Sequence, residues 1–208
     1  MNSALTFSFF TQLLTGFLAR RSDFAQPVKE SSGETHTMLR VAAGDDGALQ
    51  LLFDRWKLPL LSFFYRALGS HADAEDLTLE VFVRLHRSAA DYRPTARFST
   101  FLFHIAHNLL RNEYRRRRRK PAQPVAPESF DYVPAEPGSG QELAELEEVF
   151  QRALLRIPEK YRTPLLLLQQ QQLDYPEAAA VLRISENSLR VLIHRGRRLL
   201  KTEMETIT

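Results

Sequence analysis

The chain has 208 residues, no cysteine and a formal net charge of +3, with 44% hydrophobic and 25% charged residues. This length allows one large or two small domains, and the lack of cysteine excludes disulfides, thiolate metal sites and cysteine nucleophiles. The charge is segregated, because residues 93–120 carry a net +8 and residues 152–201 a net +6, with a net −7 over residues 121–151 between them. Two separate basic surfaces suggest a polyanion bound at two places, most simply nucleic acid.

The first 38 residues are predicted to be a leader, either disordered or the product of a start codon placed too early. Their apolar run, residues 4–18, resembles a signal or an interfacial helix, but its cations Arg20 and Arg21 follow it. A secretory signal carries its cations first, and a membrane-spanning helix needs about 20 apolar residues. We therefore expect a cytoplasmic chain, and Met38 is a candidate for the physiological start.

From Asp45 to Arg119 the apolar residues recur at helical spacing, which predicts three or four packed helices. In the first of them, Pro59 is expected to interrupt or kink the helix; Gly69 ends it, and Ser70 caps the next one. The two later helices have apolar stripes that run through Ala74, Leu77, Val81 and Leu85, and through Phe98, Leu102, Ile105 and Leu109.

Residues 121–140 hold five prolines and two glycines, which exclude a helix or a central strand. Their acidic composition keeps the segment solvated, so it is predicted to be a linker. Helical periodicity restarts at residues 142–157, and no segment of the chain has the period of a strand. The sequence therefore predicts an all-α protein of two small helical domains joined by a flexible, Pro-rich tether.

The stretch LDYPEAAAVLRISENSLRVLIHRGRRLL, residues 173–200, has the pattern of a helix-turn-helix. Asp174 and Glu177 have the spacing of a capping box, residues 183–185 would form the turn, and Ser185 would cap the second helix. That helix carries one cationic stripe, made of Arg190, His194, Arg197 and Lys201. Such a stripe suits the major groove of duplex DNA, although it is also compatible with a solvated surface.

A cluster of acidic residues lies upstream, where Asp73, Asp76 and Glu80 fall at positions i, i+3 and i+7 of a predicted helix. Catalysis by paired carboxylates needs a pocket and contrasting environments, and nothing in the sequence indicates either. The cluster is therefore interpreted as a solvated or protein-docking surface, and no catalytic residue is predicted.

The segment RPTARFSTFLFHIAHNLLRNEYRRRRRK, residues 93–120, interleaves cations with aromatic residues that we expect to be able to reach solvent, namely Phe98, Phe101, Phe103 and Tyr114. This combination suits single-stranded nucleic acid, whose bases stack on aromatic rings and whose phosphates attract cations. His104 and His107 have the spacing of metal ligands, but no third ligand is nearby, so no metal or cofactor is predicted. Within the basic run, Arg111 and Arg115 are interpreted as positional contacts and residues 116–120 as a less specific electrostatic grip.

Two parts of the chain resemble bacterial RNA polymerase sigma factors of the extracytoplasmic-function (ECF) group. The stretch from HADAEDLTLEVFVRLHRS through NEYRRRR, residues 71–118, is similar to sigma region 2, and RIPEKYRTPLLLL through HRGRRLL, residues 156–200, to sigma region 4. The segment MLRVAAGDDGALQLLFDRW, which begins at Met38, resembles the usual start of the family. The resemblance implies a leader (1–38), a region 2 domain (39–120), an acidic linker (121–141), a region 4 domain (142–203) and a tail (204–208).

The resemblance also implies a binding factor with three surfaces. The first would dock on the clamp helices of the largest polymerase subunit through Asp73, Glu75, Asp76, Glu80, Phe82 and Arg84. The second would capture and help melt the minus-ten promoter element through Arg97, Thr100, Phe101, His104, His107, Asn108, Arg111, Asn112, Tyr114 and Arg115. The third would read the minus-thirty-five element through Ser185, Glu186, Asn187, Ser188, Arg190, His194, Arg195 and Arg197.

Several positions depart from the family pattern. Relatives usually have glutamine where Leu79 lies, glycine at the positions of Gln172 and Arg183, and a polar residue followed by a basic one at positions 191–192. Pro164 lies in what is usually continuous helix, and we expect it to be the first residue of a helix that begins there. A missing cation on the recognition helix is expected to weaken DNA binding, so a sigma-like protein with weakened promoter recognition stays an alternative.

The expected partners are core RNA polymerase and promoter DNA, with an anti-sigma factor as an optional third and no small-molecule substrate. Two other classes of protein fit the sequence less well. A freestanding helix-turn-helix regulator would leave the upstream domain unexplained. A DNA recombinase or nuclease would need a catalytic serine or a metal-binding carboxylate set, and the sequence contains no convincing one, so the protein is not predicted to be an enzyme.

Overall fold

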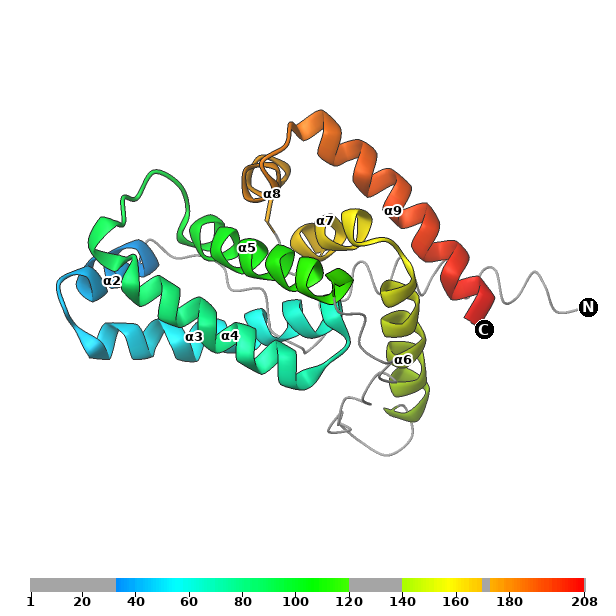
Figure 1. Cartoon of the computed structure of the whole chain (residues 1–208), viewed down its shortest axis with the longest axis horizontal. Helices are drawn as coiled ribbons and strands as arrows, with labels where there is room; N and C mark the ends of the chain where they lie inside the picture. Colours follow the sequence, from blue (N-terminus) through cyan, green and yellow to red (C-terminus); the bar gives the residue numbers. More distant parts are fainter. Residues whose placement is uncertain (1–32, 120–139, 170–172, 208) are drawn as a thin grey trace, which may run out of the picture.

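The computed structural model describes residues 33–119, 140–169 and 173–207, and within these ranges it contains helices and turns but no strand (Figure 1). The predicted all-α fold is thereby confirmed. Most of the leader, most of the linker, Lys120 and Gln172 lie outside the described residues. The helices are α2 (Gly33–Ala42), α3 (Asp46–Leu68), α4 (His71–Arg87), the short 3₁₀ helix η1 (Ala89–Asp91), α5 (Phe98–Arg119), α6 (Gly140–Arg156), α7 (Glu159–Gln169), α8 (Tyr175–Leu182) and α9 (Glu186–Ile207).

Helices α2 to α5 form a bundle whose boundaries follow from local sequence signals. The side chain of Asp45 accepts a hydrogen bond from Ala48 N at the start of α3, and Ser70 accepts one from Asp73 N at the start of α4. Gly69 ends α3 in the left-handed region with φ 71°, as predicted. Helix α3 runs through Pro59 without a break, because its packing against α2 and α4 outweighs the cost of an internal proline.

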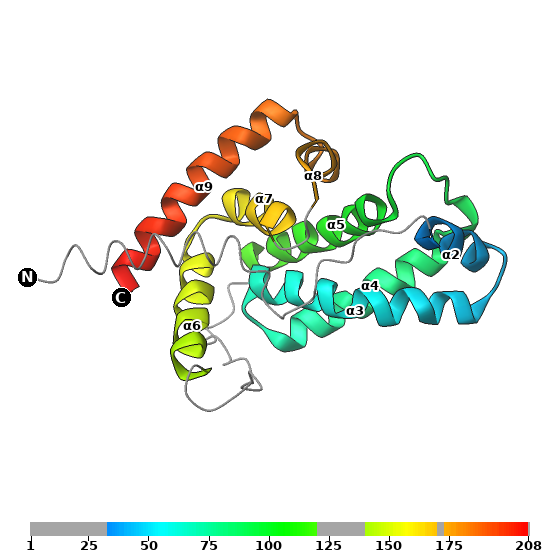
Figure 2. The ribbon, with the colours of Figure 1, turned by 180° about the vertical axis from the view of Figure 1, so that it is seen from behind.

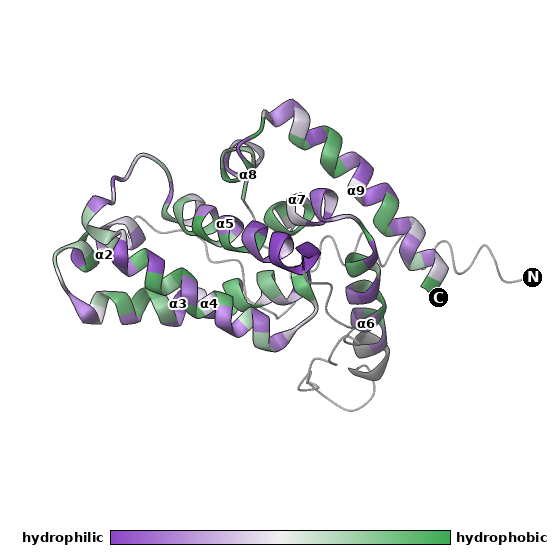
Figure 3. Ribbon diagram, viewed as in Figure 1, coloured by the Kyte–Doolittle hydropathy of each residue, from purple (hydrophilic) through white to green (hydrophobic). Residues whose placement is uncertain are grey.

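Aromatic rings fill the centre of this bundle. Trp56 lies with its ring centroid 6.0 Å from that of Phe98 and 6.1 Å from that of Phe103, and Phe63 packs edge-on against Phe103. The apolar stripes predicted for α4 and α5 point inward, which Figure 3 shows as the hydrophobic sides of these helices. Our expectation that Phe98, Phe103 and Tyr114 reach solvent is wrong, because all three are buried.

Helix α2 begins inside the segment predicted as a leader. Met38 is fully buried, and the buried carboxylate of Glu34 forms an ion pair with Arg55 of α3 at 2.6 Å. Residues 33–38 therefore contribute to the packing of the N-terminal bundle, and the expected boundary at residue 38 falls in the middle of α2.

Helices α6 to α9 form the C-terminal half, in which α9 packs against α6, α7 and α8. Helix α8 has the predicted capping box of Asp174 and Glu177. Helix α7 starts at Glu159 and contains Pro164, so the expected helix start at Pro164 is wrong. Helix α9 continues to Ile207, through the residues expected as a tail, because Met204 is buried against the rest of this half.

The two halves pack against each other. Helix α3 contacts α6 and α7, and α5 contacts α8 (Figure 1). The view from behind in Figure 2 shows the same relation, with α8 lying next to α5. The sequence predicted two domains on a tether, and the structure adds that they share a polar and apolar contact surface.

Candidate nucleic-acid interface

The acidic side chains of α4 lie in two different environments. Glu75 and Asp76 are exposed, whereas Glu80 forms an ion pair with Arg84 at 2.7 Å on the same helix. Phe82 is buried, with its ring 4.8 Å from the ring of Phe53, so it supports the helix from inside. The free acidic charge of this face is therefore concentrated at Glu75 and Asp76.

Asp73, the first acid of the same face, is turned toward the arginine run of α5. It pairs with Arg117 through a short hydrogen bond and with Arg116 at 3.5 Å. This pairing links the first turn of α4 to the last turns of α5, and it distinguishes Asp73 from its exposed neighbours.

The arginine run of α5 is helical as far as Arg119 and forms the hydrophilic end of this helix (Figure 3). Three of its arginines, Arg116 to Arg118, form ion pairs with acidic residues. Glu113 receives hydrogen bonds from Arg116 and Arg117 at 2.6 to 2.8 Å. Burial raises the pKa of Glu113, but these hydrogen bonds outweigh it and hold the pKa below its ordinary value. Arg118 reaches Glu159 at the start of α7. Some of the arginines that were predicted to bind DNA phosphates therefore form contacts within the protein.

The remaining predicted minus-ten residues divide into exposed and buried groups. Arg111, Asn112 and Arg115 are exposed along the second half of α5, where they can meet phosphates. Thr100 and Tyr114 are buried, and the hydroxyl of Tyr114 donates to Ala67 O at 3.4 Å. Both are placed as packing residues in this conformation, in which they offer no surface to DNA.

The first half of α5 carries Phe101, whose partly buried ring lies 5.0 Å from the ring of Tyr92, and Arg97 directly precedes this helix. The guanidinium of Arg97 is 3.1 Å from the carboxylate of Glu177 on α8. The cation nearest the start of α5 is therefore already engaged by an anion from the other half of the protein.

Two histidines of α5 also face α8. Arg183 donates from Nε to Nε2 of His104 at 3.1 Å, and the side chain of Asn108 lies 3.4 Å from Nδ1 of the same ring. Burial lowers the pKa of His107 to about 4, helped by the charge of Arg111 and opposed by a hydrogen bond with the backbone of Val181. Burial, Arg183 and Arg111 also lower the pKa of His104. Both rings are therefore neutral at pH 7.

The recognition helix α9 presents an open face. Its cap is Ser185, whose hydroxyl accepts from Ser188 N at 3.2 Å, and the guanidinium of Arg190 lies over the ring of Tyr175 at 4.5 Å and 3.8 Å from Glu186. The predicted minus-thirty-five residues are all exposed: Ser185, Glu186, Asn187, Ser188, Arg190, His194, Arg195 and Arg197. The turn before α9 has Arg183 in the left-handed region, with φ 57°.

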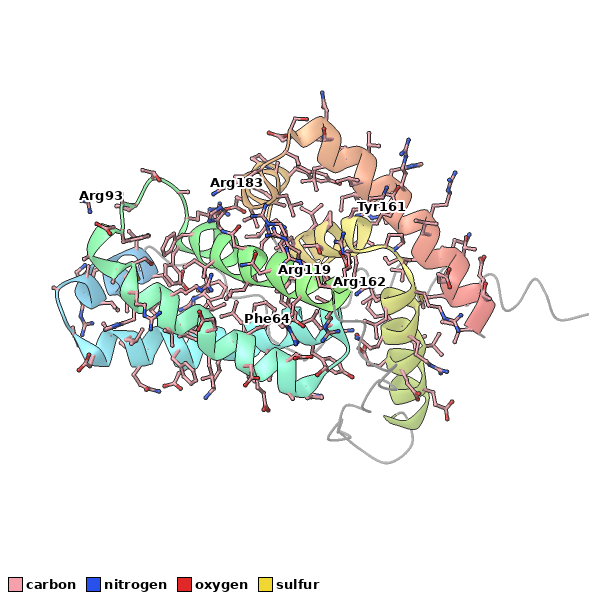
Figure 4. All side chains as sticks on the ribbon, viewed as in Figure 1. Phe64, Arg93, Arg119, Tyr161, Arg162 and Arg183 are labelled. Atoms are coloured by element: carbon pink, nitrogen blue, oxygen red, sulfur yellow. The ribbon has the colours of Figure 1, made fainter. Side chains whose placement is uncertain are left out.

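Sequence reasoning missed the polar residues that join the two halves. Arg162 of α7 is only 8% exposed and donates to the carbonyl of Ala67 and, at 2.7 and 3.0 Å, to the carbonyls of Leu155 and Ile157 (Figure 4). Burial lowers the pKa of its guanidinium. No pattern in the sequence marks this residue, since an arginine in a helix is usually a surface residue.

Among the described residues, no group of His, Asp and Glu side chains could hold a metal ion. None of the described helices is long and apolar enough to cross a membrane.

The comparisons with known proteins agree with this layout. The model of Sigma-70 region 2 matches residues 52–120, and the model of Sigma-70, region 4 matches residues 147–200. The ECF RNA polymerase sigma factor SigE of Mycolicibacterium smegmatis is 33% identical over 186 residues, which cover 86% of this chain and 70% of the relative. The ECF sigma factor SigW of Bacillus subtilis is 29% identical over 81% of this chain and 95% of its own.

Solved structures show the same fold. CnrH, in complex with the cytosolic domain of CnrY, superposes with a TM-score of 0.64 and 23% identity, over 84% of this chain and 99% of that one. The sigma factor RpoE of Bartonella quintana, in complex with the anti-sigma factor NepR, gives a TM-score of 0.59 with 20% identity, over 84% and 98% of the two chains.

Regions 2 and 4 in this order define the sigma-70 class of transcription initiation factors. Together the two models match more than half of the residues, and ECF sigma factors are the relatives found across most of the chain. The chain therefore belongs to the family of ECF RNA polymerase sigma factors. Proteins of this family are not enzymes, and the chain directs promoter-specific transcription initiation. This assignment replaces the alternative of a freestanding helix-turn-helix regulator.

Proposed function

We propose that three surfaces of the chain divide the work of a sigma factor. The exposed acids of α4, Glu75 and Asp76, dock on core RNA polymerase, since an acidic helix face offers charge complementarity to a basic partner. The basic face of α5 around Arg111 and Arg115 captures single-stranded DNA of the minus-ten element. The open face of α9, with Arg190 and its neighbours, reads the minus-thirty-five element in the major groove.

The observation that carries this proposal is that the three surfaces lie on separate helices, each of which packs against a hydrophobic core. Residues 39–120 would form the polymerase and minus-ten domain and residues 142–203 the minus-thirty-five domain, with residues 121–141 as their linker. The departures at Leu79, Arg183, Val191 and Leu192 leave the helices intact.

The compartment and the regulator follow as further parts of the proposal. A factor that acts on RNA polymerase and the chromosome works in the cytoplasm, and we place the chain there. The similar protein from Bartonella quintana is bound to an anti-sigma factor. We include an anti-sigma factor among the partners of this chain on that basis, and no small molecule.

Reconstitution with bacterial core polymerase tests the proposal. The full chain should bind core enzyme and start transcripts at discrete positions on genomic DNA, which sequencing of transcript 5′ ends would reveal. Exchange of Glu75 and Asp76 to lysine should reduce core binding at least tenfold. The matched control exchanges two exposed acids of α6, Glu145 and Glu148, to lysine and should bind as the wild type does. Unchanged core binding by the α4 variant would disprove the docking assignment.

A further inference from the structure

The outer face of α9 carries one apolar side chain among polar ones. Val191 is 49% exposed, and among the side chains that the structure describes in α6 to α9, no other large hydrophobic one is exposed. Its neighbours one turn before and after it on this face, Asn187, Ser188, His194 and Arg195, are all polar and exposed. Single apolar residues are common on protein surfaces, so the position of Val191 on the helix decides whether it has a role.

Val191 lies opposite the buried side of α9. That side consists of Leu189, Ile193, Gly196 and Leu200. Since successive residues of a helix are about 100° apart, Val191 points almost directly away from this buried side. Helix α9 lies along the outer edge of the molecule in both views (Figures 1 and 2), with α6, α7 and α8 packed against it. Val191 is therefore at the centre of the open face of α9.

The position of Val191 along the helix is also informative. It lies in the second turn of α9, which begins at Glu186. In a helix-turn-helix, the residues near the N-terminus of the recognition helix reach the edges of the bases in the major groove. Val191 is therefore placed where a side chain meets bases.

The two arginines nearest to Val191 lie on either side of it, and each contacts a tyrosine of another helix. The guanidinium of Arg190 lies over the ring of Tyr175, 4.5 Å from its centroid. Arg195 is hydrogen-bonded to the hydroxyl of Tyr161 of α7, and this contact lowers the pKa of the phenol. The tyrosines hold both cations at the flanks of the open face, where the phosphates that border the groove would lie.

An apolar centre between two cations matches one feature of the major groove. Thymine is the base that presents a methyl group there, at C5. A valine side chain forms no hydrogen bond, so it gains free energy from DNA by removing an apolar group from water. We propose that Val191 reads a thymine of the minus-thirty-five element through its C5-methyl group, while Arg190 and Arg195 bind the flanking phosphates. This inference rests on the proposed assignment of α9 to that element.

Exchange of thymine for uracil tests the proposal, because it removes the methyl group and keeps the hydrogen-bonding groups of the base. The full chain would be reconstituted with bacterial core polymerase on a promoter identified from transcript 5′ ends. Each thymine of the minus-thirty-five element, on either strand, would be replaced singly by deoxyuridine, and the affinity of the holoenzyme measured by competition. At one position the affinity should fall about threefold to fivefold, as expected for about one buried methyl group.

Two variants show whether Val191 carries this preference. Val191→Ala should bind the thymine promoter about as weakly as the wild type binds the uracil promoter, and it should not distinguish the two. Thr202→Ala is the matched control, because it shortens a β-branched side chain on the exposed side of the same helix, about three turns further on. This control should keep the wild-type ratio of the two affinities. Melting temperatures would verify that both variants fold as the wild type does.

The outcomes separate this proposal from the assignment on which it rests. The proposal is overturned if the element contains no thymine, if no thymine is sensitive to the exchange, or if Val191→Ala keeps the wild-type preference. Equal weakening by Val191→Ala on thymine and uracil promoters would also overturn it, since Val191 would then contact something other than the methyl group. The assignment of α9 has its own test: if scrambling the minus-thirty-five element leaves holoenzyme binding unchanged, that assignment fails, whatever the uracil promoters show.

Discussion

Arg183 and His104 lie 79 positions apart in the chain and are joined by a hydrogen bond of 3.1 Å from Nε of the arginine to Nε2 of the histidine. This bond requires an unprotonated Nε2, because a proton there would face the guanidinium with another donor. This contact between the helix-turn-helix and α5 therefore depends on a neutral His104, and the burial of His107 beside it also favours the neutral ring.

Acid should destabilise the packing of α8 on α5. The pKa of His107 is lowered from the ordinary value of 6.5 to about 4, so between these values the unfolded chain binds more protons than the folded one. The stabilisation is fully present above pH 6.5 and is lost as the pH falls toward 4, with a loss of about 2 kcal/mol at pH 5. Urea unfolding at pH 7.5 and pH 5 measures it.

Variants separate this effect from general acid sensitivity. His104→Asn with His107→Asn should flatten the pH dependence over this window. His86→Gln, a change on the exposed side of α4, should retain the wild-type slope. An equal slope in all three proteins would show that the covered histidines do not carry the effect.

Gly69 and Gly44 form a matched pair for testing the joint between the halves. Both have positive φ, but a Cβ at Gly69 would lie 2.6 Å from Leu155 Cδ1 of α6, whereas one at Gly44 would meet nothing within 4 Å. Gly44→Ala should cost about 1 kcal/mol in unfolding free energy, the conformational term alone. Gly69→Ala should cost about 1 kcal/mol more, because the end of the Leu155 side chain must shift to make room. If urea denaturation gives equal losses of unfolding free energy for the two variants, the close approach of Leu155 to Gly69 is contradicted.

Glu113 should contribute more to the free energy of unfolding than an acidic residue on the surface does. It is buried and neutralises Arg116 and Arg117, so Glu113→Gln removes hydrogen bonds to charged groups and should lower the unfolding free energy by roughly 1–3 kcal/mol. The control, Glu148→Gln, affects an exposed pair with 3.7 Å separation and should cost less than about 0.5 kcal/mol. Thermal melts at neutral pH would compare them, and similar losses would count against the internal role of Glu113.

The open face of α9 should bind duplex DNA through phosphates. Arg190→Ala and Arg197→Ala should each reduce the slope of log affinity against log salt concentration by about one unit, measured with a mixed-sequence duplex. Arg152→Ala, at an exposed position of α6, is the control and should leave the slope unchanged. If neither α9 variant changes the slope of log affinity against log salt concentration, this face of α9 does not contact DNA phosphates.

Local signals in the sequence predicted much of the fold. The ends at Gly69, Ser70 and Asp174 were predictable because a cap involves residues within one turn of each other. The buried faces of α4 and α5 were predictable from helical spacing. Pro164 was misjudged because the packing of α7 against α9 tolerates an internal proline, which propensity alone disfavours.

The contacts between the halves could not be predicted in this way. Arg162, Gln151 and Glu177 join elements that are far apart in the chain, and hydrogen bonds from side chains to distant carbonyls follow no sequence period. For the same reason the sequence predicted that the whole basic run of α5 binds DNA, although Asp73 and Glu113 form ion pairs with part of it.

The C-terminal end of α3 has one more consequence. Its carbonyls at Tyr65 and Ala67 accept hydrogen bonds from α6 and α7, and that of Leu68 accepts one from α5, so this helix end is completed in part by residues of the other half. Carbonyl groups that lose these donors on separation become accessible to water, which can replace each hydrogen bond at small net cost. The hydrogen bonds between the halves can therefore be released and remade at small net cost.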